Sequence, residues 1–181
     1  QPSLELPEIG TPLAPSRWRE INTMTIAYGH GIAVSPLQLV SGVAALVNGG
    51  FYVPPTLLKR EGDEVVVAKR VLSAETSAQM RRLMRMVVST GTGKKAAVRG
   101  YAVGGKTGTA DKLSARGYYK DATISSFVGA FPMDAPRYII LVLVDEPKGN
   151  ERTFNYATGG WVAAPAVGRV VARMATLIGM A

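Results

Sequence analysis

The sequence predicts an α+β fold in which helices flank an antiparallel sheet. The predicted elements follow in the order helix, helix, three strands and helix, which is typical of this class. The links between the strands are too short for the crossover that a parallel sheet needs, so neighbouring strands are expected to pair antiparallel. A chain of 181 residues can bury about 70% of its unfolded surface, which is enough for a hydrophobic core.

The first predicted helix begins after Ser35, whose hydroxyl can cap it. Pro36 suits the first helical position, and Gln38 completes a capping box with Ser35. An asparagine followed by two glycines at residues 48–50 is expected to end the helix. Its core-facing apolar stripe is predicted to comprise Leu39, Val40, Val43, Ala44 and Val47.

Two short extended segments are predicted next, at residues 51–59 and 64–68, with a turn at 61–63. Ser73 is predicted to cap a second helix that ends near residue 89, and a glycine-rich turn follows at 90–95. The inner face of this helix is expected to comprise Met80, Leu83, Met84 and Val87. Its arginines are expected to lie mostly outside: Arg81, Arg82 and Arg85.

Three strands are predicted at residues 100–110, 123–131 and 138–145. A loop of about fifteen residues is expected between the first two strands, and a tight turn at 132–137 between the last two. A final helix is predicted at about residues 160–180. Its packing stripe is expected to comprise Val162, Ala166, Val167, Val170, Met174, Leu177 and Ile178.

The composition excludes several kinds of site. The absence of cysteine removes disulfides and thiol nucleophiles, and it fits the cytosol and the periplasm equally well. His30 is the only histidine, so a Ser-His-Asp triad is not expected and a multi-histidine zinc site is impossible. The net charge of +8 favours anionic surroundings. However, the basic residues are scattered, lack a nucleic-acid-binding signature, and are interpreted as solvated helix and loop faces.

No membrane or targeting segment is visible. No apolar run reaches the ~20 residues of a spanning helix, and no signal peptide begins at Gln1. Residues 1–16 carry four prolines and begin abruptly, which suggests a loop or a truncated edge. Any anchoring segment is therefore expected to lie outside this sequence.

Residues 100–107 match the phosphate-loop pattern G-x-x-x-x-G-K-[ST], and an apolar run at 139–146 ends in two acids. A phosphate loop needs a buried strand before it and a helix that starts at its lysine. Residues 94–99 are too charged for a buried parallel strand, and Gly108 follows the lysine with no helical stripe before Gly117. A nucleotide site is therefore not expected.

The alternative is a strand through Lys106, Thr107, Gly108 and Thr109. Alternation would place the two threonine hydroxyls on one face and the lysine ammonium on the other. Two hydroxyls near a cation suit a substrate carboxylate, and Gly108 allows a close backbone approach. If the strand is a sheet edge, a peptide substrate can pair beside it. The segment by itself leaves open a polar strand that binds no ligand.

Lys106-Thr107-Gly108 matches the third signature of penicillin-binding proteins and serine β-lactamases, whose set is S-x-x-K, a serine-asparagine motif and K-T-G. From about residue 18 to 168 the chain resembles the class B penicillin-binding proteins, most of all the division-specific monofunctional type. Five blocks in family order carry the resemblance: YGHGIAVSPLQL at 28–39, GKTGTA at 105–110, FVGAFP at 127–132, VDEP at 144–147 and GGWVAAP at 159–165.

The resemblance implies the transpeptidase fold shared with serine β-lactamases, and peptidoglycan cross-linking that β-lactams block. A serine attacks the penultimate D-alanine carbonyl of one stem peptide, the terminal D-alanine leaves, and an amine of another stem takes the acyl group. By resemblance, Lys106 supplies positive potential and orients the motif serine. Thr107 and Thr109 hold the carboxylate of the substrate or drug, beside Gly108, and the Thr109 N–H is half of the oxyanion hole.

No serine in the chain has a lysine three places on or begins a serine-x-asparagine triplet. Residues 1–181 are therefore interpreted as the C-terminal portion of one transpeptidase domain whose nucleophile precedes Gln1, and the chain alone is expected to be inactive and poorly stable. By resemblance the enzyme needs no cofactor or metal and lies on the periplasmic face of the bacterial inner membrane. Its expected partners are stem peptides, β-lactams, the N-terminal half of the domain and membrane proteins of division, but not nucleic acid.

Some residues depart from the family pattern. Tyr118 and Tyr119 lie in the predicted loop that covers the active site in relatives, so they are candidate substrate contacts or ordinary surface aromatics. His30 stands where relatives often have an aromatic ring, and a local packing or hydrogen-bonding role is expected. Residues 155–158 depart from the tyrosine-rich sequence before the paired glycines. Two other functions stay open: a β-lactamase or D,D-carboxypeptidase of the same fold, and a non-catalytic scaffold.

Overall fold

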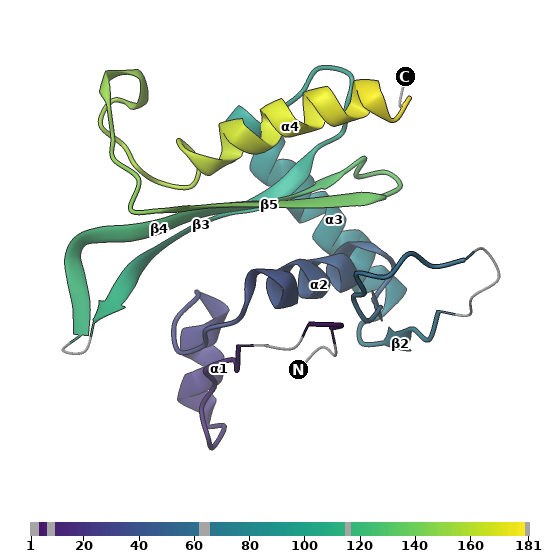
Figure 1. The fold of residues 1–181 in the computed structure, drawn as a ribbon, viewed down its shortest axis with the longest axis horizontal. Coiled ribbons are helices and arrows are strands. Elements are labelled where there is room, and N and C mark those ends of the chain that lie inside the picture. Colours follow the sequence, from purple (N-terminus) through teal and green to yellow (C-terminus); the bar gives the residue numbers. More distant parts are fainter. Residues whose placement is uncertain (1–3, 7–9, 62–65, 115–116, 180–181) are drawn as a thin grey trace.

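The computed structural model describes residues 4–6, 10–61, 66–114 and 117–179, with the backbone alone at 113–114 and 117–121. One helix, α4, lies along one face of the main sheet, α1 and α2 lie on the other side, and α3 crosses behind it (Figure 1). The elements are α1 (Glu20–Ala27), α2 (Pro36–Val47), β1 (Phe51–Tyr52), β2 (Lys69–Arg70), α3 (Ala74–Ser89), η1 (Lys94–Ala96), β3 (Gly104–Ser114), β4 (Gly117–Phe131), β5 (Tyr138–Asp145), η2 (Glu151–Thr153) and α4 (Ala163–Leu177).

The main sheet confirms the three predicted strands and their antiparallel pairing. Its order is β3-β4-β5, so β3 is an edge strand in the part of the sheet that the structure describes. β5 has the predicted bounds, and the tight turn before it is also observed. β3 begins at Gly104, later than predicted, because Val98 and Tyr101 form only an isolated bridge.

The long loop predicted between the first two strands is wrong. β3 and β4 continue past their predicted ends as a two-stranded ribbon, which pairs Asp111 with Thr123 and Leu113 with Tyr118. Glycine, lysine and aspartate in this stretch are poor strand formers, and they indicated a loop. Pairing along the ribbon nevertheless satisfies backbone N–H and C=O groups whatever the side chains are. The ribbon projects beyond the end of β5 (Figure 1).

The two helix starts that were predicted from capping serines are confirmed. The Ser35 hydroxyl accepts a hydrogen bond from the Gln38 N–H at 3.3 Å, and the Gln38 side chain accepts one from the Ser35 N–H at 2.8 Å. The Ser73 hydroxyl accepts from the Thr76 N–H at 3.0 Å. Because a cap involves residues three apart in the chain, the sequence alone is enough to locate it.

The inner face of α2 and α3 differs in part from the prediction. In α2, Val43 and Val47 are buried, whereas Leu39 is exposed. In α3, Met84 is buried as predicted, but Leu83 is exposed and Val88 is buried instead. The cause is that α3 crosses the sheet: Met84 packs in the cluster that contains α2, and Val88 in the cluster that contains α4. A prediction that assumes a single apolar stripe on α3 accounts for the contact with one cluster and misses the contact with the other.

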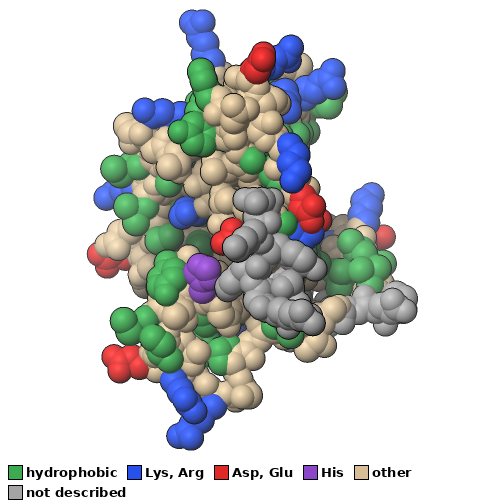
Figure 2. All heavy atoms as spheres, turned by 90° about the vertical axis from the view of Figure 1, so that its left-hand side faces the viewer, with side chains coloured by type: hydrophobic (Ala, Val, Ile, Leu, Met, Phe, Trp, Pro, Cys, Tyr) green, Lys and Arg blue, Asp and Glu red, His purple; other side chains and the backbone are tan. Residues whose placement is uncertain are grey.

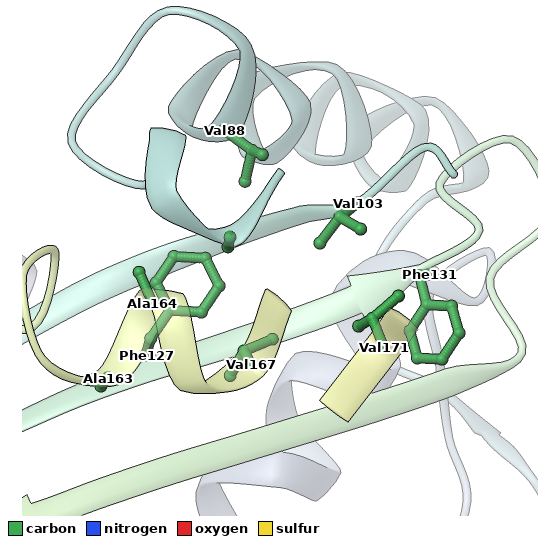
Figure 3. Close-up of a cluster of buried hydrophobic side chains, with 9 residues drawn as sticks. Val88, Val103, Phe127, Phe131, Ala163, Ala164, Val167 and Val171 are labelled. Carbon is green, nitrogen blue, oxygen red and sulfur yellow. The ribbon is translucent and has the colours of Figure 1, made fainter. Parts of the chain in front are cut away.

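The predicted stripe of α4 has the right period and the wrong phase. Val167 is buried as predicted, but Leu177 is 84% exposed and Val170 is also exposed, while Val171 and Ala175 are fully buried. The sequence favoured the larger residues, whereas the small ones lie against the sheet because they permit a closer approach. Figure 3 shows the resulting core, in which Phe127 and Phe131 of β4 pack against Val167 and Val171 of α4, together with Val88, Val103, Ala163 and Ala164.

Helix α1 was not predicted from the sequence. Half of its residues are β-branched (Ile21, Thr23, Thr25 and Ile26), and none of its residues is buried, so it has no apolar stripe to detect. Its start is closed by the Asn22 side chain, which accepts a hydrogen bond from the Arg19 N–H at 2.8 Å. Large apolar side chains are exposed in and around it: Trp18, Ile21, Met24, Tyr28, Ile32 and Val34. Figure 2 shows hydrophobic side chains beside the single histidine on this face of the molecule.

The two short extended segments are confirmed only in part. β1 pairs antiparallel with β2, which follows the predicted segment 64–68 instead of lying within it. Most of the turn predicted at 61–63 lies outside the described residues. In the described part of the chain, no helix combines the length and the apolar character that a membrane crossing requires.

Candidate active site

The segment Lys106–Thr109 lies near the start of β3, which is the edge strand of the described sheet. Cross-strand partners share a face of a sheet, so they locate each side chain. Thr107 is paired with Phe127, which belongs to the core under α4, and Lys106 is paired with Val128, which belongs to the cluster that α2 covers. The predicted alternation is confirmed: the hydroxyls lie on the α4 face and the ammonium lies on the α2 face.

Two hydrogen bonds hold the threonine hydroxyls from the α4 side. The hydroxyls of Thr92 and Thr107 lie 2.9 Å apart, and the Thr109 hydroxyl accepts a hydrogen bond from the Gly159 N–H at 3.1 Å. Thr92 follows α3 and Gly159 precedes α4, so three segments far apart in the sequence converge here. Thr92 could not be found from the sequence, because its partner is fifteen residues away and no motif links them.

Glycines make this convergence possible. A Cβ on Gly159 would lie 2.5 Å from the Gly108 carbonyl oxygen and closer still to the Ser126 carbonyl, and a Cβ on Gly160 would lie 2.5 Å from the Thr92 carbonyl. These neighbours are backbone atoms, which cannot avoid the contact by changing a side-chain rotamer. The paired glycines before α4 are therefore needed so that the chain can lie directly against the strand that carries Gly108.

Lys106 presents its charge to solvent. Its side chain is exposed, and Nζ donates a hydrogen bond to the Thr107 carbonyl oxygen at 2.7 Å. Among the residues that the structure describes, it makes no ion pair. An ammonium without a carboxylate partner leaves positive potential at the edge strand that also carries the two hydroxyls, which suits an anionic group.

The phosphate-loop interpretation is excluded by the backbone. Residues 106–109 continue straight through β3, and no helix starts at Lys106 to direct N–H groups at a phosphate. The segment before it contains only the short helix η1 and an isolated bridge, not a buried parallel strand. Residues 100–107 therefore do not form a phosphate loop, as the sequence argument predicted.

Tyr118 and Tyr119 do not lie in a loop, as predicted, but on β4. The Cα of Tyr118 is paired with that of Leu113, in the ribbon. The side chains of these two tyrosines lie outside the described atoms, and their role as substrate contacts stays a prediction. His30 makes an edge contact with the Tyr28 ring at 5.4 Å after α1, in agreement with the expected local role.

The base of the ribbon is tied to β5 by Lys112. Its Nζ lies 3.0 Å from Asp145 and 2.8 Å from Glu146. The hydrogen bonds to Glu146 and Asp145 raise the pKa of Lys112 above its ordinary value. Among the described residues, no cluster of acidic or histidine side chains is arranged to hold a metal ion. The polar groups on the Lys106–Thr109 segment are two hydroxyls, backbone amides and one ammonium. Such a set can bind a carboxylate.

Comparisons with known proteins identify the family and the fold that this chain resembles. The family described as "Penicillin binding protein transpeptidase domain" matches residues 1–172. The probable peptidoglycan D,D-transpeptidase FtsI of Caulobacter vibrioides is 44% identical over 98% of this chain and 32% of its own length. The transpeptidase domain of Burkholderia pseudomallei penicillin-binding protein 3 superposes with a TM-score of 0.86 at 36% identity, over 98% of this chain and 53% of that one.

A second solved structure is penicillin-binding protein 3 of Mycobacterium tuberculosis in complex with ampicillin. It has a TM-score of 0.83 at 27% identity, over 97% of this chain and 42% of that one. The likeness confirms the predicted α+β fold of the transpeptidase type. The chain spans about a third of the length of the curated relative that it matches and about half of the solved domain.

Proposed function

The chain belongs to the family of penicillin-binding protein transpeptidase domains, and we propose that residues 1–181 form the C-terminal portion of the transpeptidase domain of a peptidoglycan D,D-transpeptidase. A serine supplied by the rest of the domain attacks the penultimate D-alanine carbonyl of a stem peptide. The terminal D-alanine leaves with the proton that the serine has lost. The ester then passes its acyl group to an amine of a second stem, which restores the serine.

In this reaction, β3 serves as the wall that binds the substrate. An extended stem peptide pairs along the edge strand through backbone hydrogen bonds, and Gly108 keeps that approach open. The ammonium of Lys106 supplies positive potential and orients the motif serine. The N–H of Thr109 forms half of the oxyanion hole, a contribution that is typically worth about 3 kcal/mol per donor.

The observation that carries the proposal is the way in which the two hydroxyls are held. A hydroxyl has one hydrogen to donate and lone pairs to accept. Since Thr109 accepts from the Gly159 N–H, its own hydrogen remains available. If Thr92 donates to Thr107, the hydrogen of Thr107 is available too. Both hydroxyls can then donate to the terminal carboxylate of the stem peptide or to that of a β-lactam.

Labelling of the full-length protein with a fluorescent penicillin tests this function. We expect one covalently labelled serine, no label after incubation with unlabelled penicillin, and a label that persists for many minutes. Folded protein that takes no label would refute the assignment. Release of the drug within seconds would instead indicate a β-lactamase, and release of D-alanine without cross-linking a carboxypeptidase.

The surroundings of the enzyme are also a proposal. The relative from Caulobacter carries the division name FtsI, which supports action at the periplasmic face of the inner membrane beside membrane proteins of division. The exposed apolar side chains around α1 support contact with the remaining part of the domain, because patches of this kind mark interaction surfaces. For the same reason we expect residues 1–181 alone to be poorly stable, and we expect them to be inactive because they contain neither the Ser-x-x-Lys nor the Ser-x-Asn motif.

A further inference from the structure

A pocket lies away from the Lys106–Thr109 segment, between α3 and the turn that joins β4 to β5. Its volume is about 430 Å³, and it is open to solvent. Arg81, Arg82 and Arg85 of α3 form one side, while Ala102, Met133 and Asp134 form the other. These arginines were interpreted from the sequence as a solvated helix face. The fold instead directs them into a hollow of the size that ligand sites commonly have.

The charge of these arginines is not balanced on their own helix. Residues three and four apart are neighbours on a helix, and Arg81 and Arg85 therefore repel each other. The only acidic residue of α3 is Glu75, in its first turn, too far from the arginines to offset them. Asp134 lines the same pocket, yet among the described residues it forms no ion pair with any of the three. The repulsion among the three arginines lowers the stability of the helix, and a bound anion would relieve it. We therefore regard the cluster as a place for an anion.

One of the three guanidinium groups is fixed in place. Arg85 is half-buried, and its Nη1 donates to the Val103 carbonyl oxygen at 2.9 Å. The remaining N–H groups of that guanidinium stay available, because a guanidinium has five. Arg81 is half-buried as well, and Arg82 is exposed. The pocket therefore has one rigid donor and two adaptable ones, which suits a carboxylate held by paired N–H groups.

We propose that this pocket docks an acidic segment of a partner protein, with a carboxylate among the arginines and a neighbouring apolar side chain on Met133 and Ala102. The apolar side of the pocket favours a peptide, because a peptide can place an apolar side chain inside the pocket. A membrane surface would instead be contacted by basic residues that point outward from the protein. The carboxylate of Asp134 disfavours a phosphate, since a phosphate carries close to two negative charges at neutral pH. A carboxylate carries only one.

The position of the pocket connects it to β3. The Met133 N–H donates to the Ala102 carbonyl at 2.7 Å, and the Met133 side chain fills the space over Gly104, the first residue of β3. A docked segment therefore touches residues that directly support the start of the strand that carries Lys106. The binding proposal itself does not depend on the proposed function, because no pocket residue belongs to residues 106–109.

Fluorescence anisotropy on the full-length protein tests the proposal, with a labelled octapeptide of alternating glutamate and leucine as the probe. Replacing its glutamates by glutamine, or its leucines by glycine, should each weaken binding, the first by about tenfold or more. The double variant Arg81→Gln/Arg82→Gln should weaken binding of the original peptide to a similar extent. Arg85 is left unchanged because it bonds Val103.

The matched control is Arg169→Gln/Arg173→Gln, which removes the same charge from exposed positions on α4. It should change binding by less than about twofold. Equal losses in the two double variants would overturn the proposal, since attraction would then follow net charge alone. A second result would also overturn it: the peptide binds neither the wild type nor the Arg81→Gln/Arg82→Gln variant, whereas phosphatidylglycerol vesicles bind the wild type and not that variant. The pocket would then be a lipid site.

Discussion

Replacing Gly159 by alanine tests whether the contact between the residues before α4 and strand β3 holds Lys106–Thr109 in position. The new Cβ would stand 2.5 Å from the Gly108 carbonyl oxygen, and ordinary contacts begin at 3.4 Å. The chain at Gly159 or the strand at Gly108 must therefore move by about 1 Å, because backbone atoms have no rotamer to change. The hydrogen bond from the Gly159 N–H to the Thr109 hydroxyl, now 3.1 Å, would lengthen beyond the normal range.

The size of the effect follows from that displacement. Overpacking of this kind costs about 1–3 kcal/mol of stability. The loss of reactivity should be larger, since a misplacement of about 1 Å at a reacting centre can lower the rate about a hundredfold. We therefore expect the full-length Gly159→Ala protein to remain folded and to be acylated by fluorescent penicillin about a hundredfold more slowly.

The rate of acylation and the melting temperature are to be measured together. Gly42→Ala is the matched control, because a Cβ at this position in α2 meets nothing within 4 Å and alanine in a helix interior stabilises it by about 0.5–1 kcal/mol. That variant should be acylated at the wild-type rate. Acylation of Gly159→Ala within about twofold of the wild-type rate would refute the idea that this contact positions the strand.

Three further changes address the hydroxyl network, the core and the ribbon. Thr92→Val should slow penicillin acylation about tenfold with little change in melting temperature, because Thr107 loses its hydroxyl partner; an unchanged rate would exclude a positioning role for Thr92. Phe127→Ala should cost about 3–5 kcal/mol in denaturant titrations, because the ring is fully buried, whereas Leu177→Ala, at a position 84% exposed, should cost less than about 1 kcal/mol; similar losses would contradict the packing of α4 described above. Because the pKa of Lys112 is raised in the folded protein, its contribution is complete below the ordinary pKa of 10.5 and is lost as the pH rises through the raised value. Melting temperatures of wild type and Lys112→Gln should therefore converge as the pH rises above 10.5, and a gap that does not narrow would refute the assignment.

Local features were predictable because they depend on residues close together in the chain. The Ser35 and Ser73 caps and the bounds of β5 are of this kind. The alternation of Lys106 and Thr107 across the sheet follows from strand geometry once the strand is recognised. The family motif led to the same strand, and the comparisons confirm the family.

The failures have two physical causes. Helix α1 has no periodic stripe to detect, because none of its residues is buried. The others depend on contacts between distant segments, and the β3–β4 ribbon is held by backbone pairing that side chains do not encode. The face of α4 that is buried depends on how closely its small residues let the helix pack, not on the size of its apolar residues: Ala164 lies in the cluster with Phe127, and Gly168 lies against the backbone of Lys95 and Ala96.

By itself, the sequence determined the family, the α+β class and the strand on which the binding wall is built, because these are written in short motifs and local periodicities. Only the tertiary structure decided that Thr92 and Gly159 hold the two threonine hydroxyls, and that three arginines of α3 meet Met133 in a pocket. Both arrangements join segments far apart in the chain, and no local pattern records which distant residues the fold will bring together.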